Sequence, residues 1–128
     1  MTKKKREEIY KKFNGRCAYC GRVIEYKDMQ VDHLVPQRAY IGAPEEIVNS
    51  DENLMPSCRR CNHYKRAHEL ETFRGMLKKM REKVLGTYLG KVAVDYGMVA
   101  WLGWDGKFYY EYASELVKEE CNDVSRSV

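Results

Sequence analysis

The chain has 128 residues, of which 44% are hydrophobic and 12% aromatic, so its length predicts one domain (1–128) and its composition excludes a disordered chain. No apolar run reaches the roughly 20 residues that span a bilayer, and the N-terminus carries no secretory signal pattern. We therefore expect no membrane partner and a reducing, cytoplasmic location, where paired cysteines are more often metal ligands than disulfides.

The net charge of +4 is unevenly distributed along the chain. Residues 1–22 carry eight Lys or Arg against two Glu, whereas residues 105–128 carry three cations against six acidic side chains. The basic N-terminal part predicts a polyanionic partner. A solvated lysine-rich helix accounts for the same charge equally well.

The first half of the chain predicts short elements. Residues 4–13 predict a helix, which ends at Asn14-Gly15 because both residues tolerate positive φ. Four elements are expected after it: a tight turn at 17–21, a strand at 29–36, a loop at 39–52 and a second strand at 54–56. From about residue 59 the chain is expected to be helical, since good helix formers follow and no proline interrupts them.

The second half predicts a helix and then strands. An apolar stripe with spacings of three and four residues predicts a helix over 70–85. Residues 92–112 predict strands, with Trp104-Asp105-Gly106-Lys107 as a hairpin turn. The aromatic side chains of this region are expected to fill a core or the interface of a homodimer or larger assembly. A short acidic helix is expected at 115–120.

Two Cys-x-x-Cys pairs are separated by 37 residues. A structural zinc ion binds four soft ligands in a tetrahedron, and each pair supplies two thiolates from one turn. Such a site leaves no open coordination position, so the ion is expected to be structural; a redox pair or a disulfide is the alternative. The expected ligands are Cys17, Cys20, Cys58 and Cys61, with Cys121 left over.

Four polar residues lie between the pairs or just after them: Asp32, His33, Asn53 and Asn62. Each alone is ordinary, as a core histidine, a turn residue or a polar residue on a helix. In a regular strand Asp32 and His33 point to opposite faces, so both serve one site only if the strand twists or ends there. Their order and spacing carry more weight than any one of them.

The combined pattern resembles the HNH endonuclease family, whose fold is the ββα-metal motif. The resemblance covers about residues 14–68. The matching segments are Cys17-x-x-Cys20, Val31-Asp32-His33-Leu34-Val35-Pro36-Gln37, Asn53-Leu54 and Cys58-Arg59-Arg60-Cys61-Asn62-His63-Tyr64-Lys65.

The resemblance implies a role for each matching residue. His33 is expected to be the general base, and Asn53 to position that base and its loop. Asp32 and Asn62 are expected to bind a catalytic divalent metal, Mg²⁺ or Mn²⁺, because the amide of Asn62 offers a hard oxygen ligand. His63 is expected to be a bystander. Flanking DNA phosphates are expected to contact Arg59, Lys65 and Arg66.

The resemblance therefore implies an α+β fold: a ββα-metal core with a structural zinc knuckle (about 14–70), followed by a helix and a small C-terminal β-hairpin region (about 71–128). It implies a metal-dependent DNA endonuclease, in a bacterial or phage-like setting, that leaves 5′-phosphate and 3′-hydroxyl ends and has weak sequence preference. Two alternatives stay open: a non-catalytic zinc-ribbon module that binds nucleic acid, and an interaction protein that docks another subunit. Only the four polar residues discriminate the endonuclease from the binding module.

Overall fold

The computed structural model describes residues 1–36 and 44–114, and these fall into two compact units. One unit comprises Met1–Glu69 together with the described residues from Lys107 onward, and the other comprises Leu70–Gly106. Within the described ranges, no helix combines the length and the apolar character that crossing a membrane requires. The expectation of a single domain concerns independent folding and stays a prediction.

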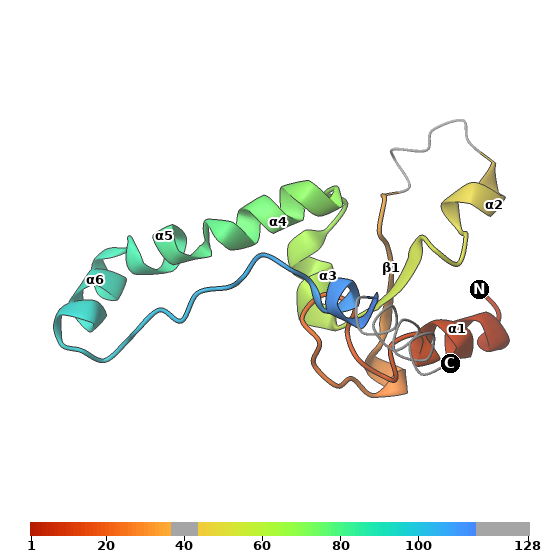
Figure 1. The fold of residues 1–128 in the computed structure, drawn as a ribbon, viewed down its shortest axis with the longest axis horizontal. Helices are drawn as coiled ribbons and strands as arrows, with labels where there is room; N and C mark the ends of the chain where they lie inside the picture. Colours follow the sequence, from red (N-terminus) through yellow and green to blue (C-terminus); the bar gives the residue numbers. More distant parts are fainter. Residues whose placement is uncertain (37–43, 115–128) are drawn as a thin grey trace, which may run out of the picture. The chain divides into compact units, whose positions relative to one another are not determined.

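Helix α1 (Lys3–Lys11) opens the first unit (Figure 1). It begins where the Thr2 hydroxyl oxygen accepts a hydrogen bond from the Lys5 amide at 3.2 Å, an ordinary N-cap. It ends as predicted, because Asn14 and Gly15 adopt positive φ values of 55° and 76°.

Part of the N-terminal positive charge serves the fold itself. The Arg6 Nη2 atom donates to the carbonyl oxygens of Tyr26 and Met29, both at 2.9 Å. The Lys12 Nζ atom donates to the carbonyl oxygen of Leu54 at 3.1 Å, and burial lowers the pKa of its ammonium group. The basic N-terminal part is therefore a weaker argument for a polyanionic partner than its charge alone indicated.

Two short strands form an antiparallel sheet. Strand β1 (Gln30–His33) pairs with β2 (Leu54–Ser57), with Asp32 opposite Met55. All four residues of β2 are buried, which fixes the register of the pair. Helix α3 (Arg59–Lys65) follows β2 directly and packs against β1. The mixed class of helices with a small antiparallel sheet is thus confirmed.

The connection between the strands contains a helix that was not predicted. Helix α2 (Glu45–Val48) lies within residues 39–52, which we expected to be a loop. A 3₁₀ turn, η1 (Tyr26–Asp28), precedes β1. The matching residue Gln37, the acidic helix expected at 115–120 and the fifth cysteine, Cys121, lie outside the described residues.

The predicted C-terminal hairpin is wrong. Residues 109–114 are helical, and no strand occurs between 92 and 112. The Tyr109 and Tyr110 amides donate to the carbonyl oxygens of Tyr19 and Ala18, at 3.0 and 2.8 Å. The β-prone aromatic run therefore finds its backbone partners on the turn at 17–20 instead of on a neighbouring strand, and tertiary context overrides its local preference.

The second unit consists of three helices followed by residues 96–106, which form neither helix nor strand. The single helix predicted over 70–85 is interrupted at Lys79, whose φ of −90° and ψ of 1° depart from helical values. The three helices are α4 (Leu70–Lys78), α5 (Met80–Leu85) and α6 (Tyr88–Asp95).

Candidate functional site

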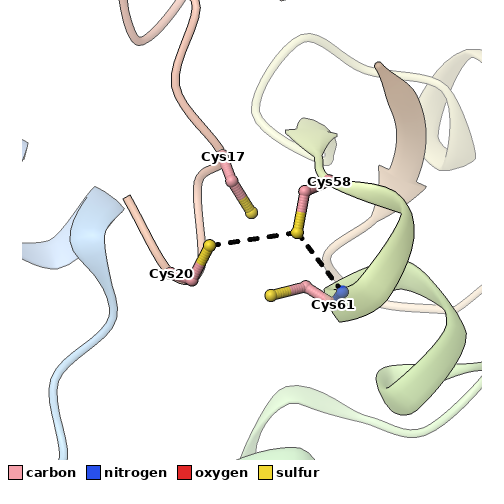
Figure 2. Close-up of side chains that lie close together, drawn as sticks. All are labelled: Cys17, Cys20, Cys58 and Cys61. Carbon is pink, nitrogen blue, oxygen red and sulfur yellow. Dashed lines mark hydrogen bonds between the residues drawn. The ribbon is translucent and has the colours of Figure 1, made fainter. Parts of the chain in front are cut away.

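The four cysteines of the two Cys-x-x-Cys pairs form one cluster (Figure 2). Cys17 and Cys20 come from a turn, and Cys58 and Cys61 come from the beginning of α3. All four sulfur atoms lie within 4.8 Å of one another, and those of Cys20 and Cys58 are 3.9 Å apart. A tetrahedral zinc site with Zn–S bonds of about 2.3 Å places its sulfurs about 3.8 Å apart. The cluster therefore fits a structural metal ion such as zinc.

Backbone hydrogen bonds shape the turn that carries the first pair. The Cys17 amide donates to Arg22 O at 2.9 Å, and the Gly21 amide donates to Cys17 O at 3.0 Å. Gly21 has a φ of 79°, which a residue with a Cβ rarely adopts. The Ala18 amide donates to Pro56 O at 2.8 Å, so the turn is attached to β2 as well as to the cluster.

The clustered thiols shift one another's pKa values. Hydrogen bonds from Cys20 and Cys61 lower the pKa of Cys17. The hydrogen bond to Cys17 raises the pKa of Cys20 to about 11, and the hydrogen bonds to Cys17 and Cys20 raise the pKa of Cys61 strongly. A divalent cation binds such thiolates directly.

Asp32 takes part in a buried ion pair. The Lys65 Nζ atom lies 3.0 Å from Asp32 Oδ2, and it donates to the carbonyl oxygen of His33 at 3.1 Å. The Lys65 side chain is fully buried, and Asp32 is 7% exposed. The prediction that Lys65 contacts DNA phosphates is therefore wrong, because its ammonium group is withdrawn from the surface to compensate a buried carboxylate.

The hydroxyl group of Tyr19 donates a second hydrogen bond to the same oxygen, Asp32 Oδ2. Burial, and then the negative charge of Asp32, raise the pKa of Tyr19 well above its usual value, so the hydroxyl keeps its proton and acts as a donor. Tyr19 lies between the first two cysteines, and its position alone does not indicate this contact, because a tyrosine in a turn is commonly a surface or core residue.

His33 is half-buried and is oriented by a residue that the sequence analysis did not single out. Its Nε2 atom lies 2.9 Å from Asn49 Oδ1, just after α2. An Nε2–H that donates to this oxygen leaves Nδ1 as the basic nitrogen of the ring. Asn49 lies 16 residues away along the chain, so spacing alone could not connect it with His33.

Asn53 holds the backbone around His33 in place. It is buried, and its Oδ1 accepts from the Val35 amide at 2.8 Å. Its Nδ2 donates to the carbonyl oxygens of Val35 and Val48, at 3.1 and 2.8 Å. The chain after β1 is thereby fixed against the end of α2. The positioning role that the resemblance implies for Asn53 stays a prediction.

The other candidates lie on or after α3. Asn62 is half-exposed, and its side chain forms no hydrogen bond with any described residue, so its amide is available to a ligand. Arg59 and His63 are exposed. Arg66 is exposed too, and its φ of 52° places it after the end of the helix.

Comparison with known proteins agrees with the resemblance. Residues 17–68 match the HNH endonuclease family. The chain is 40% identical over 52 residues to the CRISPR-associated endonuclease Cas9 of Corynebacterium diphtheriae, covering 41% of this chain and 4% of that protein. It is 41% identical over 58 residues to the Septu protein PtuB of Bacillus thuringiensis, covering 44% of this chain and 21% of that protein. The chain thus spans a small part of these curated relatives.

A solved structure is also similar, that of the type II-C Cas9 enzyme from Actinomyces naeslundii. The match has a TM-score of 0.47 and 25% identity, and it covers 72% of this chain and 10% of that one. The resemblance to the HNH endonuclease family is confirmed over residues 17–68, which include the cysteine cluster and all four polar residues between and after the pairs.

We expect the purified protein to hold about one zinc ion per chain and to lose it on Cys58→Ser, with a lower melting temperature, because the substitution opens a site that joins two distant segments. Elemental analysis and thermal denaturation measure both effects, and Cys121→Ser is the matched control that should keep its zinc. A zinc-free wild-type protein with disulfide-bonded cysteines would contradict the assignment.

Lys65→Met should destabilise the protein by about 3–5 kcal/mol, because it leaves the buried Asp32 carboxylate without a countercharge. Arg66→Met, one residue further on and exposed, should leave the free energy of unfolding nearly unchanged. Urea denaturation of the two zinc-loaded variants measures the difference. Equal stability of the two would show that Lys65 does not compensate Asp32.

Proposed function

We propose that this protein is a metal-dependent DNA endonuclease that hydrolyses phosphodiester bonds, leaving 5′-phosphate and 3′-hydroxyl ends. The observation that carries the proposal is the imidazole of His33, oriented by Asn49 and placed directly after a carboxylate within the HNH-matched segment. A module that only binds nucleic acid has no need of an oriented base next in sequence to a buried carboxylate. The relative from Corynebacterium diphtheriae, Cas9, is an endonuclease, which supports the same reaction class.

In this proposal His33 takes the proton from the attacking water. A neutral imidazole is suited to this role near pH 7, and a fixed ring orientation lets it act without reorganisation. The hydrogen bond to Asn49 supplies the orientation, and Asn53 keeps the adjoining backbone in place. The active-site loop is therefore assembled before substrate arrives.

The residues assigned to the catalytic metal fit a hard cation. Asp32 Oδ1 receives no hydrogen bond from any described residue, since both of the carboxylate's donors contact Oδ2. The amide oxygen of Asn62 is the second ligand atom, and oxygen donors suit Mg²⁺ or Mn²⁺. When bound, such an ion would supply positive charge that stabilises the leaving 3′-oxygen and the pentacoordinate phosphate.

Phosphate contacts are assigned to exposed cations only. Arg59 and Arg66 keep the role that the sequence suggested for them, and Lys3, Lys4 and Lys11 of the N-terminal segment are also exposed. Contacts to the phosphate backbone fix the position of the duplex without reading its bases, so weak sequence preference is proposed. The expected cytoplasmic location and the homodimer or larger assembly stay predictions.

His33→Ala should lower the rate of plasmid cleavage in Mn²⁺ by about 10²–10⁴-fold, because it removes the general base. DNA affinity, measured by fluorescence anisotropy, should change little. His63→Ala, an exposed histidine on α3, is the matched control and should cleave at the wild-type rate. Undiminished cleavage by folded His33→Ala protein would show that His33 is not the general base. A wild-type protein that binds DNA fully but never cleaves it would favour the binding module.

Asn62→Ala should shift the dependence of cleavage rate on Mn²⁺ concentration to higher metal, because it removes one of two protein ligands. Asn62→His should keep part of the activity with a preference for softer ions. Cleavage rates across a Mn²⁺ titration measure both effects. Superimposable curves for Asn62→Ala and wild type would mean that Asn62 does not contact the metal.

A further inference from the structure

The hydroxyl of Tyr19 links the cysteine cluster to the carboxylate of Asp32. Tyr19 is 4% exposed and lies between Cys17 and Cys20, so the turn that presents two sulfurs also presents this hydroxyl. Its ring packs against that of Phe108 in a T-shaped arrangement, with ring centroids 5.6 Å apart and planes at 81°. The Tyr19 side chain is therefore held by packing as well as by its own backbone.

Two donors converge on one atom of the carboxylate. The Tyr19 hydroxyl and the Lys65 ammonium group both contact Asp32 Oδ2, and Lys65 also lies 5.9 Å from the centre of the Tyr19 ring. The other oxygen, Oδ1, receives no hydrogen bond from a described residue. The two oxygens of one carboxylate thus have different environments, one saturated with donors and one open.

We propose that Tyr19 is a positioning residue that holds Asp32 Oδ2 against Lys65 and so keeps Oδ1 turned toward a divalent cation. This inference rests on the proposed function, because it concerns the same metal site. The four cysteines fix the turn that carries Tyr19, and Tyr19 in turn fixes the Asp32 carboxylate. The structural metal site thereby stabilises the geometry of the catalytic metal site.

The charged groups around Asp32 predict how removal of the Tyr19 hydroxyl affects metal binding. Without the Tyr19 hydrogen bond, the Asp32 carboxylate is free to rotate and to offer both oxygens to the Lys65 ammonium group. A divalent cation must then compete with a buried ammonium for Oδ1. Partners that orient metal ligands in this way are typically worth about 10-fold to 100-fold in metal affinity.

The test compares Mn²⁺ affinity in three zinc-loaded proteins without DNA: wild type, Tyr19→Phe and Tyr10→Phe. Free Mn²⁺ is measured by electron paramagnetic resonance. Tyr10 is the matched control, since its hydroxyl donates to Ile24 O at 2.8 Å in the same unit and does not touch Asp32. We expect about 10-fold weaker Mn²⁺ binding for Tyr19→Phe, unchanged binding for Tyr10→Phe, and equal zinc content in all three.

Every other outcome overturns either this inference or the proposed function. Equal Mn²⁺ affinity of Tyr19→Phe and wild type overturns the inference, as does an equal loss in Tyr10→Phe or a wild type that binds no Mn²⁺. A Tyr19→Phe protein that loses zinc or cooperative melting overturns it in favour of a purely structural role. A wild type that binds Mn²⁺ but cleaves no DNA overturns the proposed function alone, and the binding comparison still decides the role of Tyr19.

Discussion

Four sulfur atoms within 4.8 Å of one another join a turn near the N-terminus to the start of α3, and the segments that carry Tyr19, Asn62 and Lys65 meet at that junction. The turn carries Tyr19, and α3 carries Asn62 and Lys65. Strand β2 runs into Cys58 and pairs with β1, which carries Asp32 and His33. A chain of 128 residues buries a modest core, so a metal-binding cluster that ties these segments together is the constraint on which the site depends.

The sequence predicted this core because the signals there are local and chemically specific. Paired cysteines at a spacing of three residues indicate a metal-binding turn whatever surrounds them, and Asn14-Gly15 ended α1 as its tolerance of positive φ required. The two strands and α3 were expected within a few residues of their observed limits. The fold then brings the four cysteines, which come from two distant segments, into one cluster.

The remainder depended on contacts between distant residues. Lys65 has the sequence environment of a surface lysine, and only the buried carboxylate of Asp32 explains its full burial. Asn49 and Tyr19 contact His33 and Asp32, which lie 16 and 13 residues away along the chain. The aromatic run after Lys107 has strong β preference, but its amides bind the turn at 17–20 and the chain becomes helical. Contacts of this kind depend on tertiary structure and cannot be predicted from local propensity.

The proposed function requires two different metal sites in one chain, a cluster of thiolates and a separate pair of oxygen ligands, Asp32 and Asn62. A crystal of the His33→Ala protein with duplex DNA, zinc and Mn²⁺, measured at the absorption edges of both metals, tests it directly. We expect a zinc anomalous peak at the four cysteines and a manganese peak in contact with Asp32 Oδ1, Asn62 and a DNA phosphate. A manganese peak at any other residues, or an intact Asp32–Lys65 pair with DNA bound and no manganese beside it, would rule out Asp32 and Asn62 as the ligands of a second metal ion.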